Sequence, residues 1–138
     1  LTFEELQGMF EAKEIDFAAI EEGEALNEGT AAGRGFAVSG GVAQAVTDVI
    51  HQTHPDLEVK TARAEGLKEC RKLMTLAKAG KMKGCLLEGM ACPGGCVAGA
   101  GTLLPVDLAA KVVGRYQNEA DSTSPLESAY RDKGHTLD

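Results

Sequence analysis

The chain has 138 residues, of which 43% are hydrophobic and 25% charged, and its formal net charge is −7. This composition is ordinary for one globular α/β domain over residues 1–138, and no apolar run approaches the ~20 residues of a membrane span. The first 30 residues hold nine acidic residues against Lys13, and no basic face is clustered anywhere. We therefore expect no nucleic-acid partner and no membrane partner.

Two further expectations follow from the N-terminus. It shows no basic stretch followed by an apolar one, so no secretory signal is readable and we expect a cytoplasmic protein. Because the chain does not begin with Met, we expect a fragment or a processed piece of a longer protein. The acidic run is interpreted as solvated surface, and docking of a basic electron carrier is the alternative.

The N-terminal part of the sequence predicts one helix and, further on, an exposed loop. Thr2 followed by Glu5 fits a capping box, and apolar residues then recur at helical spacing, which predicts a helix over 3–13. Residues 17–20 are expected to form a buried anchor. Residues 21–34 are acidic, contain glycine and show little periodicity, which predicts an exposed loop.

The middle of the sequence, from residue 33 to the strand that begins at Cys85, predicts a helix followed by a βαβ unit. Apolar residues from Val42 to Ile50 lie at i, i+3, i+4, i+7 and i+8, which predicts a helix over 41–53. Its entry over 33–41 closes in glycines, which indicates a tight turn with backbone N–H groups at the helix start. A strand over 57–62, a helix over 65–79 and a strand from Cys85 should form a parallel pair flanked by helices.

Burial is predicted from the same periodicity. In the helix over 65–79 the inward residues should be Leu67, Cys70, Leu73, Met74 and Ala77. Pro105 could begin another helix, and its inner side should hold Leu108, Val112, Val113 and Tyr116. The segment 121–138 is expected to be a polar tail, with a short helical candidate over 125–131.

The four cysteines divide into two kinds. Cys70, mid-helix, and Cys85, at a strand start, should behave as small buried hydrophobic residues. Cys92 and Cys96 instead flank Pro93-Gly94-Gly95, at the carboxyl end of the second strand, where ligands favour binding. A C-x-x-x-C pair admits iron–sulfur ligation, half of a zinc site or a disulfide.

Iron–sulfur ligation is the preferred interpretation of the C-x-x-x-C pair. The three histidines lie far away in sequence, and a disulfide is disfavoured by the leftover cysteines and the missing secretion signal. The amides of nearby glycines could donate hydrogen bonds to cluster sulfurs. These candidate cofactor-binding residues are Gly94, Gly95, Gly99 and Gly101.

The cysteine segment also carries a resemblance. The string from Glu88 to Gly101, EGMACPGGCVAGAG, resembles the third cysteine motif of iron-only ([FeFe]) hydrogenases. Phe36 to Val42, FAVSGGV, resembles the family's segment before a helix, and the likeness covers about residues 3 to 131. It implies one α/β lobe of a two-lobed catalytic domain whose intact parent interconverts protons, electrons and H₂.

The resemblance also implies a cofactor and roles for residues. The cofactor is the H-cluster, a [4Fe-4S] cubane joined through one cysteine to a diiron unit carrying CO, cyanide and a bridging dithiolate. Cys92 would be a terminal cubane ligand and Cys96 the thiolate that bridges the two units. Met90 would pack near the diiron ligands, and Phe36 and Ser39 would be an apolar wall and a polar neighbour.

Glu88 admits two interpretations. It is a polar or proton-handling group near the site, or a salt-bridged carboxylate at a strand end.

The sequence departs from the family in two ways. The motifs that supply the other two cubane cysteines and a proton-relay cysteine do not occur in this chain, so the isolated chain should be folded, metal-free and inactive, with a poorly ordered loop from Cys92 to Cys96. Gly99-Ala100-Gly101-Thr102-Leu103 replaces the family's usual Gly-rich continuation. The expected partners are the rest of the catalytic domain and a ferredoxin-like electron carrier. The alternatives are a sensory or cluster-assembly iron–sulfur protein and a small zinc or redox interaction module.

Overall fold

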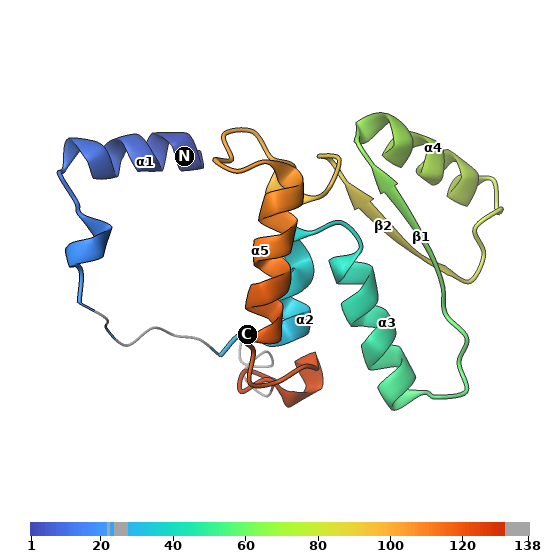
Figure 1. Ribbon diagram of the computed structural model, residues 1–138. Coiled ribbons are helices and arrows are strands. Elements are labelled where there is room, and N and C mark those ends of the chain that lie inside the picture. Colours follow the sequence, from blue (N-terminus) through green and yellow to red (C-terminus); the bar gives the residue numbers. More distant parts are fainter. Residues whose placement is uncertain (22, 24–27, 132–138) are drawn as a thin grey trace, which may run out of the picture.

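The computed structural model describes residues 1–21, 23 and 28–131, and it is an α/β structure as predicted (Figure 1). Its α-helices are α1 (Phe3–Ala12), α2 (Ala31–Arg34), α3 (Gly41–Thr53), α4 (Leu67–Lys78) and α5 (Val106–Asn118). Its strands are β1 (Lys60–Glu65) and β2 (Cys85–Met90). Short 3-10 turns are η1 (Phe17–Ala19), η2 (Gly35–Ala37), η3 (Cys96–Ala98) and η4 (Pro125–Glu127).

The two strands pair in parallel, and helices cover both faces of the pair. The register aligns Lys60 with Cys85 and Glu65 with Met90. Neighbouring strand residues point to opposite faces. Glu88 reaches the start of α3, whereas a Cβ on Gly89 would lie 3.3 Å from the Cys70 sulfur of α4. Helices α3 and α4 therefore lie on opposite faces (Figure 1).

Local signals explain where the helices begin and end. In α1 the Thr2 hydroxyl accepts the Glu5 N–H and the Glu5 carboxylate accepts the Thr2 N–H, so the predicted capping box is confirmed. Helix α4 ends at Lys78, and Gly80 follows with φ 73°, the left-handed conformation expected just after a helix. The predicted helices over 41–53 and after Pro105 are confirmed as α3 and α5.

Two element boundaries differ from the prediction. The first strand was expected over 57–62 and lies at Lys60–Glu65, because weak alternation does not locate a short strand. The short helical candidate over 125–131 is only the 3-10 turn η4.

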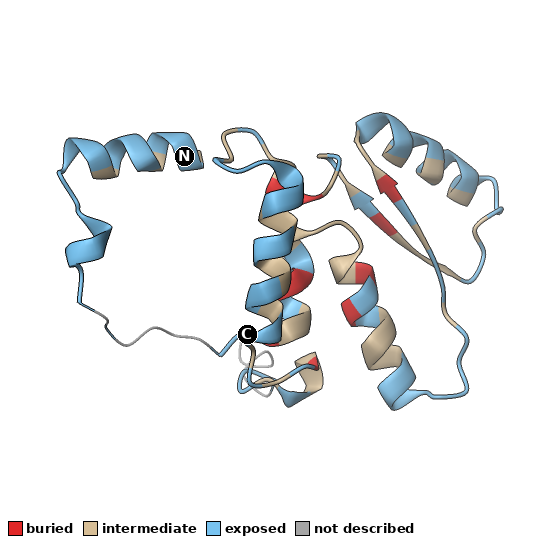
Figure 2. Cartoon of the chain, in the orientation of Figure 1, coloured by how far each residue is buried: buried red, intermediate tan, exposed pale blue. Residues whose placement is uncertain are grey.

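The buried core is small. Its buried apolar residues are Ala43, Ala45, Ala64 and Val97. Figure 2 shows the buried positions, apolar and polar together, as short separate stretches of the ribbon. Because alanine buries little apolar area, the described residues exclude little apolar surface from water.

Several predictions of burial are wrong for this reason. The expected anchor at 17–20 is exposed, with Phe17 and Ile20 each 58% accessible, and Phe17 packs edge-on against Phe10 only within the N-terminal segment. Leu67 and Met74 of α4 are exposed, as are Leu108, Val112 and Tyr116 of α5. For α4 and α5, periodicity identified an apolar helix face but could not tell whether another element covers it.

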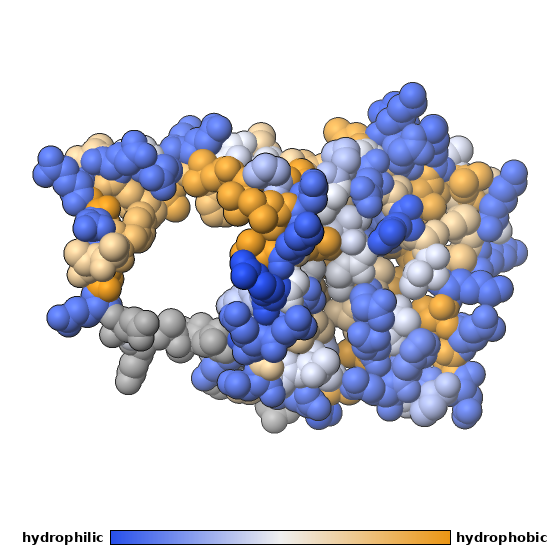
Figure 3. Space-filling view, viewed as in Figure 1, coloured by the Kyte–Doolittle hydropathy of each residue, from blue (hydrophilic) through white to orange (hydrophobic). Residues whose placement is uncertain are grey.

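Helix α1 stands apart from the body and contains no buried residue (Figure 1). Its start contacts the segment before α5, where the Glu4 N–H donates to the Gly101 carbonyl over 3.2 Å. Hydrophobic side chains gather where α1 meets the body and along α5 (Figure 3). The N-terminal segment is thus attached mainly at its first residues.

The predicted exposed loop over 21–34 ends earlier than expected. Residues 22 and 24–27 lie outside the described residues, but Thr30 and Arg34 are buried and α2 begins at Ala31. The Arg34 guanidinium donates to the Tyr116 carbonyl over 2.7 Å and lies 4.1 Å from the centre of the Tyr116 ring, which ties α2 to α5.

Residues 132–138 of the predicted polar tail also lie outside the described part. In the described residues, no helix is both long and apolar enough to cross a membrane.

Candidate functional site

The cysteine segment leaves the carboxyl end of β2, as predicted. Strand β2 ends at Met90, and a short loop leads through Cys92 to η3, which begins at Cys96. Both thiols are free; Cys92 is half-buried and Cys96 is exposed. Two potential thiolate ligands are therefore presented on one loop beside the sheet edge.

Two glycines allow this loop to lie against the turn before α3. Gly94 and Gly95 have φ angles of 98° and 97°, which side-chain-bearing residues rarely adopt. A Cβ on Gly95 would lie 2.6 Å from the Ser39 nitrogen and 2.8 Å from the Ala37 carbonyl oxygen. The Ser39 N–H donates to the Gly94 carbonyl over 3.0 Å, so Ser39 does adjoin the cysteine loop.

Three of the four candidate glycine amides donate within the protein, and their use toward a cofactor stays a prediction. The Gly94 N–H donates to Glu65 Oε2 over 2.9 Å, and those of Gly95 and Gly99 donate to the Cys92 and Cys96 carbonyls, each over 3.0 Å. These three amides are satisfied by the protein itself, because the loop folds back into turns. Gly101, with φ 74°, contacts Thr2 of the N-terminal segment.

Glu88 is a buried cap of α3. It is 7% exposed, and its carboxylate accepts the N–H groups of Gly40 over 2.5 Å and of Val42 and Ala43 over 3.1 Å. The expected amides at this helix start are confirmed, and their acceptor comes from β2. Among the described residues Glu88 forms no salt bridge, so the interpretation as a salt-bridged strand-end carboxylate is wrong. The positive end of the α3 dipole takes the place of a cation.

Glu65 is a residue of this site that sequence reasoning missed. The Ser39 hydroxyl and then the Gly94 N–H lower the pKa of its carboxyl group below the ordinary 4.5, Arg63 contributes in the same direction, and burial opposes them. The carboxylate is therefore the favoured form beside the cysteine loop. The sequence predicted a helix from residue 65, and the structure instead places Glu65 at the last position of β1.

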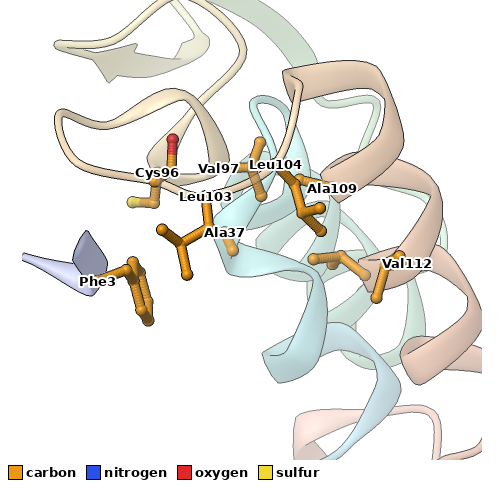
Figure 4. Close-up of a pocket in the computed structure, with 10 residues that line it drawn as sticks. Phe3, Ala37, Cys96, Val97, Leu103, Leu104, Ala109 and Val112 are labelled. Atoms are coloured by element: carbon orange, nitrogen blue, oxygen red, sulfur yellow. The ribbon is translucent and has the colours of Figure 1, made fainter. Parts of the chain in front are cut away.

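An apolar cavity of about 380 Å³ lies on the other side of the cysteine loop (Figure 4). It is lined by Phe3, Ala37, Cys96, Val97, Thr102, Leu103, Leu104, Ala109, Val112 and Val113. Phe3 of α1 and Val112 of α5 stand on opposite sides of it, with Cys96 at one edge (Figure 4). The Cys96 thiol therefore lies beside an apolar wall.

Two candidate residues lie outside this cavity lining. Phe36 is 44% exposed, and its neighbour Ala37 faces the cavity instead. Met90 is half-buried at the last position of β2, and its carbonyl accepts the Gly66 N–H over 2.8 Å. Their predicted places beside a cofactor stay predictions.

The other two cysteines cannot join the loop thiols. The Cys70 sulfur lies between α4 and the strands, 3.5 Å from the Met90 carbonyl oxygen and 3.6 Å from that of Ala64. Cys85 begins β2, about 17 Å from its far end at a rise of ~3.3 Å per residue. No group of three or more potential metal ligands occurs within the described ranges. Two thiols on one loop would provide half of the four ligands that an iron–sulfur cubane usually has.

Comparison with known proteins identifies the family. Residues 1–100 match the family described as iron only hydrogenase large subunit, C-terminal domain. The chain belongs to this family. It is 31% identical over 130 residues to the periplasmic [Fe] hydrogenase large subunit of Nitratidesulfovibrio vulgaris, strain Hildenborough, a match that covers 73% of this chain and 31% of that protein. The chain thus spans about a third of the relative, as part of a larger catalytic domain in a family that implies iron–sulfur cofactors.

Proposed function

We propose that this chain supplies two of the cysteine ligands of an H-cluster, Cys92 as a terminal cubane ligand and Cys96 as the thiolate that bridges cubane and diiron unit. The whole protein would then interconvert H₂ with protons and electrons. The observation that supports this most is the cysteine loop itself, with two free thiols, a positive-φ glycine pair and an apolar cavity beside Cys96.

When bound, the cluster would supply electron storage and the activation of H₂ at a metal, which amino-acid side chains lack. The chain's own residues hold and surround it. The apolar wall lies beside the Cys96 thiol, and Glu88 anchors the turn that carries Ser39 against the cysteine loop. Met90 and Phe36 remain candidates for contact with the diiron unit.

The remaining ligands must come from outside this chain. We propose that the rest of the catalytic domain supplies them and that a ferredoxin-like carrier exchanges electrons with the assembled protein. The isolated chain is then inactive and keeps no cubane, because two thiolates leave half of its usual ligands missing. The cytoplasmic location stays a prediction, since the relative is described as periplasmic.

The ligand assignment is tested by anaerobic reconstitution of the chain with iron and sulfide, with and without a small added thiol. The added thiol replaces the missing ligands, so we expect about four irons per chain and a [4Fe-4S] electron paramagnetic resonance signal after reduction, only when it is present. Cys92→Ser and Cys96→Ser should each abolish this uptake. Cys85→Ser is the matched control and should leave it unchanged.

Equal iron uptake by wild type and a Cys92→Ser, Cys96→Ser double variant would overturn the assignment. So would a stable full cubane on the wild-type chain without added thiol. Zinc bound through Cys92 and Cys96 and resistant to replacement by iron would favour a small zinc module.

A sensory iron–sulfur protein is the second candidate, and one observation favours it. Thr102 and Leu103, in the segment that departs from the family's continuation, line the cavity beside Cys96. The change therefore alters the surroundings of the proposed bridging thiolate. H₂ uptake by the whole protein with an artificial electron acceptor distinguishes the two, because a sensor binds the cluster without sustained turnover.

A further inference from the structure

The residue at the midpoint of the cysteine segment is held from two sides. Gly94 stands midway between Cys92 and Cys96. Its N–H donates to Glu65 Oε2 over 2.9 Å, and its carbonyl accepts the Ser39 N–H over 3.0 Å. Both backbone polar groups of Gly94 therefore bond to other elements, and only one of the two partners is a side chain.

The sheet explains why Glu65 can reach this point. Parallel pairing places Glu65 opposite Met90, so the chain that leaves β2 passes directly beside the end of β1. A Cβ on Gly66 would lie 3.9 Å from the Pro93 ring, which confirms the proximity of the two segments. A carboxylate at this position meets the loop without any rearrangement of the sheet.

The surroundings of Glu65 favour a charged acceptor. The Ser39 hydroxyl and the Arg63 charge both stabilise the ionised carboxyl group. A hydrogen bond from a backbone amide to a carboxylate is shorter and stronger than one to a neutral acceptor. Ser39 contributes directly through its N–H, which donates to the Gly94 carbonyl over 3.0 Å.

The second carboxylate of the sheet completes the arrangement. Glu88 holds the N–H groups of Gly40, Val42 and Ala43, and so fixes the turn that contains Ser39. β1 thus holds the cysteine loop directly through Glu65. β2 holds it indirectly, because Glu88 fixes the turn whose Ser39 N–H bonds to the Gly94 carbonyl. Glu88 is buried and caps α3, whereas Glu65 accepts a hydrogen bond from the cysteine loop itself.

We propose that Glu65 is a positioning residue of the cysteine loop, which holds Gly94 so that Cys92 and Cys96 are presented together to the metal group. The effect of Glu65 on the cofactor rests on the proposed function, but the hydrogen bond that anchors Gly94 to Glu65 does not. Glu65 itself lies outside the cysteine motif.

The anchor is tested first on the metal-free chain by nuclear magnetic resonance hydrogen exchange. Glu65→Ala should speed exchange of the Gly94 and Ser39 amides by about three- to tenfold, because the bond to Gly94 is lost and the adjoining one loosens. Amides inside α3 and α4 should not change. Glu65→Gln keeps an acceptor oxygen and should restore most of the protection, and Glu58→Ala, on an exposed residue before β1, is the matched control.

Two outcomes of this exchange experiment would overturn the proposal. One is an unchanged Gly94 amide in folded Glu65→Ala. The other is faster exchange throughout the chain, which would mean a merely structural role. If Glu65→Ala does not fold, the Gly94 amide proton in Glu65→Gln must still shift upfield, as expected for a neutral acceptor, and an unmoved resonance would contradict the proposal.

The consequence for the metal group is tested separately in the reconstituted chain with added thiol. Glu65→Ala should release iron to a chelator about three times faster than wild type, and Glu65→Gln should lie between them. Release at the wild-type rate would overturn the positioning role. If Gly94 responds as expected but wild type takes up no cluster, the anchor stands and the iron–sulfur assignment fails.

Discussion

Replacing Glu88 removes the side-chain cap that the described residues provide for α3. The helix begins after Gly40, which has no side chain to accept hydrogen bonds, so three backbone N–H groups depend on a carboxylate 45 to 48 residues away. An ordinary exposed cap contributes about 1 kcal/mol to stability. Glu88→Ala leaves one buried and two part-buried donors without their acceptor, so we expect a loss of about 3 kcal/mol in the free energy of unfolding.

This loss is measured by urea unfolding followed by circular dichroism. Thr2→Ala, which removes the exposed cap of α1, is the control and should cost about 1 kcal/mol or less. Glu88→Gln keeps one acceptor oxygen and should fall between the two. A Glu88→Ala chain no less stable than Thr2→Ala would refute the conclusion that the buried carboxylate holds the helix start.

Three further predictions follow from the site. Gly95→Ala should cost about 3 kcal/mol, because the new methyl group meets backbone atoms, whereas Gly84→Ala, with positive φ but open space around it, should cost only ~1 to 2 kcal/mol in the same urea assay. Because the folded-state pKa of Glu65 is lowered, its stabilising contribution is complete above its ordinary pKa and is lost as pH falls through the lower value. The urea midpoint of wild type should therefore fall more steeply than that of Glu65→Gln below about pH 4.5, and parallel curves would contradict this sign. Cys96 is exposed and should react with a maleimide faster than Cys70, whose sulfur faces two carbonyl oxygens. Mass spectrometry of the labelled peptides measures the order of reaction, and faster labelling of Cys70 would contradict the described placement of the two thiols.

Local features of the sequence predicted most elements correctly. The capping box of α1, the apolar periodicity of α3, and Pro105 before α5 all depend on residues within a few positions of one another. The strand from Cys85 and the cysteine loop at its carboxyl end were also predicted. These elements can be predicted without knowledge of the tertiary structure, because the interactions that form them are local in sequence.

Burial was the property that local patterns could not decide. Phe17, Leu67 and Met74 occupy apolar positions of regular patterns, yet all three are exposed. A periodic apolar face shows that a helix can pack, but its burial requires another element to lie against it. In this chain the described elements leave those faces uncovered.

The sequence by itself determined the residues that could bind metal: a C-x-x-x-C segment around small residues, in a string specific enough to indicate its family. Only the tertiary structure decided what holds that segment in place. Glu65 is 29 residues from Gly94, and Glu88 is more than 40 from the amides that it caps. Nothing in the spacing of these residues pairs them, because the parallel strands and the turn before α3 come together only when the chain has folded.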